Sequence, residues 1–297
     1  MKWINLCIIG LLYFCSACSN DVDFGEQYKK QVYIVNANLN AGIIDASLMM
    51  EEEAQGSISI YCASSEFPEE DVIVHYKIDT AALNAYNVRE YENATELYMT
   101  AIPENLVTFG SETVTIKQGE AYAVLPFTIN TAALDPSANN TLPITLTDAS
   151  GYEINPELQT CFYRLELDNP YSGEYNATVN ILGAFNDYYY PQFQNFVTKT
   201  LGAGGMTSLK VPQSTQVVIQ ETNPNYFIIN WNQEDNSLTL TSPVEGFQMI
   251  ESLNLAADFD QTPESVKVNY YNPDTQEFIV CYKFPNTAMI YEILKKK

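Results

Sequence analysis

One stretch of the chain brings together the residue types that bind sugars. Residues 185–196 read FNDYYYPQFQNF, in which aromatic rings alternate with amides and one acid. A sugar presents apolar C–H faces rimmed with hydroxyl groups, so its binding surface needs flat rings beside hydrogen-bonding side chains. The candidate glycan-binding residues are Tyr188, Tyr189, Tyr190, Asn186 and Asp187.

The alternative for the three tyrosines is packing in the core or rim of a sheet, because aromatic residues are enriched in strands. A strand would point Tyr188 and Tyr190 to one face and Tyr189 to the other. Pro191 favours a sheet edge or a loop instead. The sequence leaves ligand contact and packing open.

Groups that could perform catalysis are sparse. The single histidine, His75, lies in VIVHYKI, whose alternation predicts a strand residue. Paired acids such as Asp258 and Asp260 are expected by chance among 37 acidic residues, and a calcium ion wants roughly six to eight oxygens. We therefore predict a protein that is not an enzyme and that needs no metal or cofactor.

The first eighteen residues have the layout of an export signal. Lys2 precedes an apolar run over 3–15, and Ser16 and Ala17 are small residues directly before Cys18. The run is shorter than the roughly 20 residues of a membrane-spanning helix. The ending resembles a bacterial lipobox, which implies removal of residues 1–17 and acylation of Cys18, for example with palmitate. Ordinary cleavage after Ala17 without acylation is the alternative.

Residues 18–30 are predicted to form an acidic tether, because SNDVDFGE after Cys18 is polar and carries little strand or helix signal. An acidic stretch in this place resembles the signal that sends Bacteroidota lipoproteins to the outer face of the outer membrane. We expect a lipid anchor in the outer membrane and a chain that faces the cell exterior.

Composition narrows the class of partner. The 37 acidic and 14 basic residues give a formal net charge of −23, which argues against nucleic acid because such binding depends on Lys and Arg. Cys62, Cys161 and Cys281 are the cysteines beyond the export signal, and their odd number prevents complete pairing. Three buried thiols are one interpretation, and a disulfide between Cys62 and Cys161 is the other.

Short segments rich in β-branched and aromatic residues recur at intervals of about ten residues, which predicts an all-β chain. An immunoglobulin-like antiparallel sandwich is expected over 31–168, with one short helix at 80–87 and a strand at 97–103. Asn169-Pro170 marks a boundary, and 170–297 is expected to form an antiparallel β-barrel-like domain, with a second sandwich as the alternative. GAGG at 202–205 is expected to be a flexible loop.

Four segments strengthen this assignment by resemblance. KKQVYIVN at 29–36, IPE at 102–104, VTIKQGE at 114–120 and LPITLT at 142–147 occur in an order similar to the N-terminal domain of many Bacteroidota surface lipoproteins. YSGEY at 171–175 and YEIL at 291–294 resemble its companion C-terminal domain. The family is often encoded beside glycan-uptake machinery, which implies a polysaccharide or oligosaccharide as partner and an outer-membrane uptake complex as setting.

A further short motif concerns modification. Asp79-Thr80-Ala81 resembles the three-residue O-glycosylation site of exported Bacteroidota proteins, with Thr80 as acceptor.

Two functions remain open. A non-catalytic glycan-binding accessory of an uptake system should expose aromatic residues together at one end of the second domain. A structural or adhesive lipoprotein with a protein partner should instead show an unpaired apolar strand edge or patch.

The anchoring hypothesis can be tested with Cys18→Ser. The variant should leave the membrane fraction or remain unprocessed, because the serine hydroxyl cannot take the place of the thiol in acylation. Fractionation and immunoblotting measure this, and unchanged membrane attachment would refute the anchor.

Overall fold

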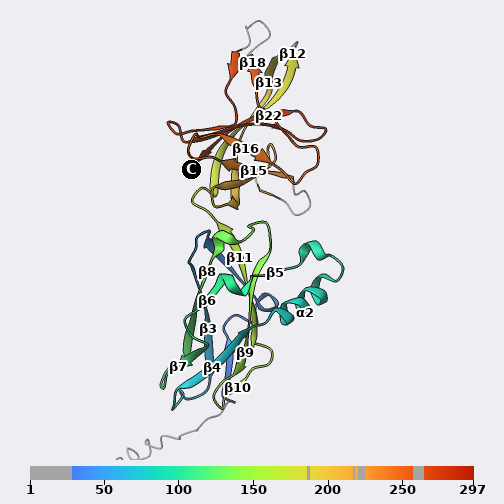
Figure 1. Cartoon of the computed structure of the whole chain (residues 1–297). Coiled ribbons are helices and arrows are strands. Elements are labelled where there is room, and N and C mark those ends of the chain that lie inside the picture. The colour runs from blue at the N-terminus through green and yellow to red at the C-terminus, as the bar shows by residue number, and fades with distance from the viewer. Residues whose placement is uncertain (1–28, 186–187, 217, 220–224, 257–263) are drawn as a thin grey trace, which may run out of the picture.

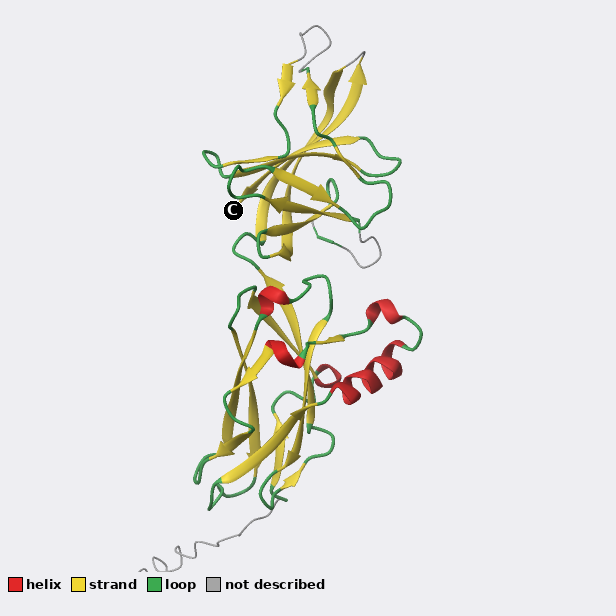
Figure 2. Ribbon diagram, in the orientation of Figure 1, coloured by secondary structure: helices red, strands yellow, loops and turns green. Residues whose placement is uncertain are grey.

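The computed structural model describes residues 29–185, 188–216, 218–219, 225–256 and 264–297. Strands dominate, and one α-helix lies at the side of the N-terminal half (Figures 1 and 2). Two sheets face each other in that half, and a strongly curled sheet follows at the other end of an elongated molecule. The expected all-β class, a sandwich followed by a barrel-like sheet, is therefore confirmed.

The N-terminal half, residues 29–168, is a sandwich of two sheets. One sheet has the order β10 (Glu153–Ile154), β1 (Gln31–Ile34), β3 (Ala54–Ala63), β8 (Tyr122–Ile129) and β6 (Val107–Phe109). The other has the order β2 (Ile43–Met49), β11 (Thr160–Asp168), β9 (Asn140–Asp148), β4 (Val72–Ile78) and β7 (Thr113–Ile116), with β5 (Thr100–Ala101) beside β9. Most neighbours are antiparallel, whereas the pairs β1 with β10, β2 with β11 and β5 with β9 are parallel.

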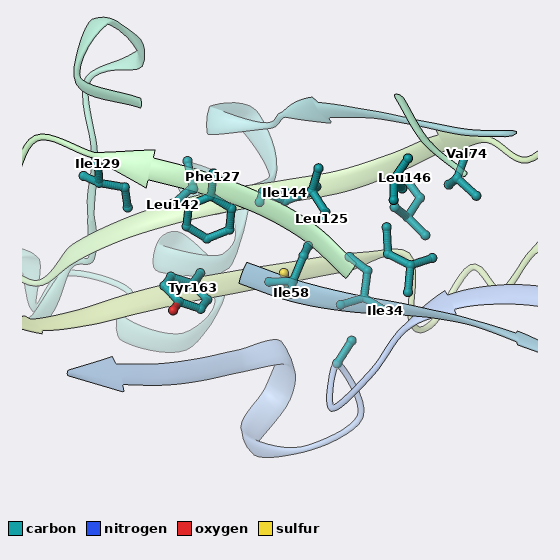
Figure 3. Close-up of a cluster of buried hydrophobic side chains, with 14 of the residues drawn as sticks. Ile34, Ile58, Val74, Leu125, Phe127, Ile129, Leu142, Ile144, Leu146 and Tyr163 are labelled. Atoms are coloured by element: carbon teal, nitrogen blue, oxygen red, sulfur yellow. The ribbon is translucent and has the colours of Figure 1, made fainter. Parts of the chain in front are cut away.

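The sandwich core lies between the two sheets and is built by alternation along each strand. In β1 and β7 every second residue is buried, as expected for strands with one face inside. Figure 3 shows aliphatic side chains of facing strands packed together with Phe127 and Tyr163. The two rings meet edge to face, with 5.2 Å between their centroids. Gly56 leaves room for Phe127, because a Cβ there would lie 2.3 Å from the ring.

The helix α2 (Thr80–Tyr91) is longer than the predicted 80–87. Asp79 caps its first turn by accepting a hydrogen bond from the Ala82 amide at 3.1 Å. Tyr86 packs on Phe162 at 4.8 Å between ring centroids, and this tertiary contact supports the second half of the helix. The described chain contains no helix with the length and apolar character to span a bilayer.

The predicted strand over 97–103 is wrong for most of its length. Short 3-10 turns occur at η1 (Asn40–Gly42), η2 (Thr95–Leu97), η3 (Glu104–Leu106) and η4 (Thr131–Ala133), and only β5 has strand pairing in this region. The buried side chain of Asn87 donates to the Met99 carbonyl at 2.8 Å and accepts from the Met99 amide at 2.9 Å. The amide side chain thus takes the place of a neighbouring strand.

The C-terminal half, residues 170–297, forms one curled sheet. Its main path is β16 (Leu238–Thr241), β15 (Tyr226–Trp231), β14 (Ser208–Pro212), β13 (Tyr188–Gly205), β12 (Gly173–Phe185), β22 (Met289–Lys296), β21 (Glu277–Lys283) and β17 (Gln248–Met249). Three short strands join it at the side: β18 (Leu253–Leu255), β19 (Glu264–Val266) and β20 (Tyr270–Asn272).

This sheet is nearly closed, which favours the barrel over a second sandwich. Ser237, just before β16, forms an antiparallel bridge with Tyr270 of β20, and β20 pairs with β21. Leu238 N also donates to Asn269 O at 2.9 Å. The interior holds an aromatic core in which Phe227 and Tyr282 lie 4.3 Å apart.

The junction between the halves is held by Asn169. Its Nδ2 donates to the carbonyls of Gly205 and Ser208 at 2.7 Å each, and its Oδ1 accepts from the Ser172 amide. Residues 202–205, predicted as a flexible loop, are instead the end of β13, and Ala203 packs against the sandwich core. That contact explains why small residues occur in a strand here.

The three cysteines are all buried thiols, which removes the disulfide between Cys62 and Cys161 from consideration. Burial raises the pKa of Cys161 and that of Cys281 to about 12 each, so both stay protonated at neutral pH.

The predicted boundary at Asn169-Pro170 can be tested with fragments 29–168 and 170–297. Each contains an apolar cluster of its own, so each should melt cooperatively. The free energy of unfolding of fragment 170–297 should be about 2 kcal/mol lower than that of the same half in the full chain, because the fragment lacks the two hydrogen bonds donated by Asn169. Calorimetry of both fragments and of the full chain measures the transitions, and a fragment without a cooperative transition would show that the boundary is wrong.

Candidate ligand-binding face of the β12–β13 hairpin

β12 and β13 form a long hairpin that ends at the far end of the molecule from β1 and β10 (Figure 1). Gly173 pairs with Leu201 near the junction, and Phe185 pairs with Tyr188 at the tip. Beyond the barrel, the hairpin projects together with β18. The tyrosines of the candidate site therefore lie in a strand at an exposed end.

A bulge interrupts this ladder next to the tyrosines. Ile181 pairs with Phe193 and Leu182 with Pro191, which leaves Gln192 as an extra residue in β13. Proline has no amide hydrogen to give to a ladder, so a bulge is a suitable place for it. The bulge places Gln192 and Phe193 on the same face of the hairpin.

The register assigns the tyrosines to two faces, as expected for a strand. Tyr188 and Tyr190 lie opposite Phe185 and Gly183, on the face of Phe193. Tyr189 lies opposite Ala184 on the other face. All three side chains are partly exposed.

Tyr189 has a structural role. It packs against a small cluster that contains Leu182, Leu253 and Cys281, and its carbonyl accepts a hydrogen bond from the Ala256 amide at 2.8 Å. Leu255 of β18 pairs with it directly. This tyrosine therefore holds β18 at the edge of β13, in agreement with the packing alternative.

The opposite face has the composition that suits a sugar. Gly183 carries no side chain, and Gln192 lies across it, since a Cβ on Gly183 would be 2.0 Å from Gln192 Nε2. Phe193 is 65% exposed although it lies in a strand. Tyr188, Tyr190, Gln192 and Phe193 together are called the hairpin face below. Asn186 and Asp187, also predicted for this site, lie outside the described residues.

Gln192 and Phe193 were missed when the candidate residues were chosen from the sequence. Both stand in the aromatic and amide stretch. The two-residue period of a strand places Gln192 on the face of Tyr188 and Tyr190, whereas Phe193 reaches that face only because of the bulge opposite Leu182. Phe196, 76% exposed, lies on the other face opposite Thr178, where Gln194 Nε2 donates to Asn180 Oδ1 at 3.0 Å.

The remaining sequence candidates are dispersed. Thr80 is exposed at the first turn of α2, and His75 is an exposed strand residue of β4. Cys18, Asp258 and Asp260 lie outside the described residues. Among the described side chains, no group of three His, Cys, Asp or Glu could hold a metal ion.

A hollow lies on the sandwich between β7 and β8. It has a volume of about 670 Å³, and its lining includes Phe67, Tyr122 and Val124, which are 63%, 57% and 46% exposed. Among the described strands, none pairs with residues 122–126 on the side away from β3. This groove is apolar and bordered by an open strand edge.

Solved structures of other proteins share the fold of this chain. A family model described only as a "-like, N-terminal domain" matches residues 28–153, and no curated protein matches the chain. A Bacteroides ovatus protein of unknown function has a TM-score of 0.55 at 15% identity, with 90% of this chain and 93% of that chain covered.

Two further solved structures share the arrangement. A multidomain Bacteroides ovatus protein including DUF1735 and an auxiliary nutrient binding protein from Bacteroides thetaiotaomicron each have a TM-score of 0.52 at 14% identity. Each match covers 86% of this chain and 89% of the other. At this identity the likeness concerns the fold, and it extends over both halves of the chain.

Tyr189 and Phe196 lie on the same face of β13, but Tyr189 packs against an apolar cluster whereas Phe196 is 76% exposed, which predicts different costs for two truncations. Tyr189→Ala should lower the free energy of unfolding by about 2 kcal/mol, less than a fully buried aromatic because the ring is partly exposed. Phe196→Ala, in the same strand, should change it by less than about 0.5 kcal/mol. Urea denaturation of both variants measures the two changes in the free energy of unfolding, and equal changes would contradict the packing role of Tyr189.

Proposed function

We propose that the protein is a non-catalytic, surface-exposed lipoprotein that binds glycan as an accessory of a polysaccharide-uptake system. The observation that carries this proposal is the hairpin face, where one exposed and two partly exposed aromatic rings lie beside an amide at a projecting end. Rings can stack on the C–H face of a sugar, and the amide can bond its hydroxyl groups in both directions.

The shape of the site favours an internal part of a long glycan. Tyr188, Tyr190, Gln192 and Phe193 follow one another along a strand and belong to an open face. An open face can accept a chain that continues at both ends, whereas an enclosed pocket would select a terminal sugar. A neutral polysaccharide also tolerates the net charge of −23, which would repel polyanions.

The position of the hairpin supports an anchored binding protein. The described chain begins at the end of the sandwich next to β10, and the hairpin face lies at the opposite end (Figure 1). With a lipid on Cys18, the sandwich would hold the binding face away from the bilayer. The fold likeness to an auxiliary nutrient binding protein is compatible with this role.

A second candidate is a structural or adhesive lipoprotein with a protein partner. The groove between β7 and β8 favours it, because the open edge at residues 122–126 could receive an extended strand beside Phe67. Pro126 removes one donor from that edge and weakens such pairing. The hairpin face therefore remains the better supported site.

The combined substitution of Tyr188→Ala and Tyr190→Ala should weaken glycan retention. If each ring contributes about 1 kcal/mol of stacking, the loss of both weakens binding about thirtyfold. The measurement is a glycan array followed by affinity electrophoresis with the retained polysaccharide, with the melting temperature recorded in parallel.

Tyr122→Ala is the matched control, because this tyrosine is 57% exposed but lies in the groove of the sandwich. It should leave glycan retention unchanged. Loss of retention in the control alone would place the site in the groove, and a large fall in the melting temperature of the double variant would show that the two tyrosines belong to the core.

A further inference from the structure

Two ionisable side chains are completely enclosed inside the barrel. Lys199 of β13 and Glu292 of β22 have no exposed side-chain surface. Their strands flank β12, where Lys199 lies opposite Tyr175 and Glu292 opposite Val179. Ala177 lies between these two positions of β12, and its small side chain leaves the space in which they meet.

The contact between them is close. Lys199 Nζ lies 2.5 Å from Glu292 Oε1, so the two groups form a short ion pair. Nζ also donates to the Pro212 carbonyl at 2.9 Å. The other carboxylate oxygen, Oε2, accepts from the Tyr282 hydroxyl at 2.8 Å.

The surroundings penalise charge on this pair. The ring of Tyr282 packs on Phe227 and Phe284, and the cluster around it is apolar. Burial raises the pKa of Glu292, although nearby Lys199 partly offsets the rise. Transfer of one proton from Nζ to the carboxylate would leave a neutral amine beside a neutral carboxylic acid, and these are the reactants of an amide bond.

We propose that Lys199 and Glu292 join covalently, through an amide bond between Nζ and Cδ that forms inside the folded barrel. The interaction would then be a permanent crosslink between β13 and β22. It is independent of any ligand on the hairpin face.

The reaction balances without a further reagent. After the proton transfer, the lone pair of Nζ attacks Cδ, and negative charge develops on Oε2, where the Tyr282 hydroxyl stabilises it. A proton then passes from nitrogen to the Oε1 hydroxyl, and the C–Oε1 bond breaks to release water. Ammonium and carboxylate have become one amide and one water molecule, with no change in oxidation state.

The polar partners in the barrel match the product better than the ion pair. An amide of this kind has one N–H and one carbonyl oxygen. Nζ would keep its hydrogen bond to Pro212, and Oε2 would keep the one from Tyr282. Oε1, the oxygen in contact with Nζ, is the atom that leaves. The product keeps one partner for its N–H and one for its carbonyl oxygen, so the apolar interior leaves no polar atom of the amide without a hydrogen bond.

The fold supplies the proximity that such a reaction needs. The two side chains come from the strands on either side of β12, and the Tyr282 hydroxyl is itself fixed by a hydrogen bond from the Ser214 amide at 3.0 Å. Well-oriented intramolecular groups react as if at effective concentrations of about 10⁵ M or more. Folding therefore takes the place of an external catalyst.

Peptide mass spectrometry of the purified full chain after trypsin digestion tests the proposal. We expect a peptide containing Lys199 joined to a peptide containing Glu292, with a total mass lower by one water than the sum of the two. Trypsin should also fail to cleave after Lys199. Recovery of both peptides separately, with cleavage after Lys199, would overturn the proposal without any variant.

Two variants examine the chemistry. Lys199→Met keeps the length of the side chain and should abolish the joined peptide, and the same joined mass in this variant would refute the assignment to Nζ. Tyr282→Phe keeps the ring but removes the hydroxyl, so the joined fraction should fall at least severalfold in protein that melts cooperatively. Complete joining in Tyr282→Phe would exclude the proposed role of the hydroxyl.

Discussion

Closure of one sheet around an aromatic core is the constraint from which the C-terminal half follows. An open sheet of this length would leave long edges and one apolar face in water. Here the bridge between Ser237 and Tyr270 brings the two ends of the sheet together. The interior then becomes dry, and any polar group inside must find its partner there, as Lys199, Glu292 and Tyr282 do.

Much of the fold could be predicted from local pattern. Alternation in β1 and β7 shows directly which residues face the sandwich core, because one residue in two is buried along each. The failures have a common cause in contacts between distant residues. Asn87 holds Met99 where a strand was expected, and Ala203 packs on the sandwich where a loop was expected. Neither contact can be read from the periodicity of one segment, because each joins two separate elements of the chain.

The candidate site was predictable to a similar extent. The two-residue period separates Tyr189 from Tyr188 and Tyr190 once a strand is assumed, and the structure has that strand. The same period places Gln192 with Tyr188 and Tyr190, whereas the position of Phe193 could not be foreseen, because a bulge is defined by the pairing of two strands. Gly183 is informative only together with Gln192, whose side chain occupies the space above it.

The continuity of β13 has a mechanical consequence. This single strand of 18 residues begins in the hairpin face and ends at the junction, where Gly205 accepts a hydrogen bond from Asn169. β12 runs from the junction to the same tip, so a polymer that pulled on the tip would load both strands along their axes. The covalent backbones of β12 and β13 then carry the tension in parallel, and the hydrogen bonds between the two strands are not pulled apart. The molecule is thus built to resist tension directed along its length.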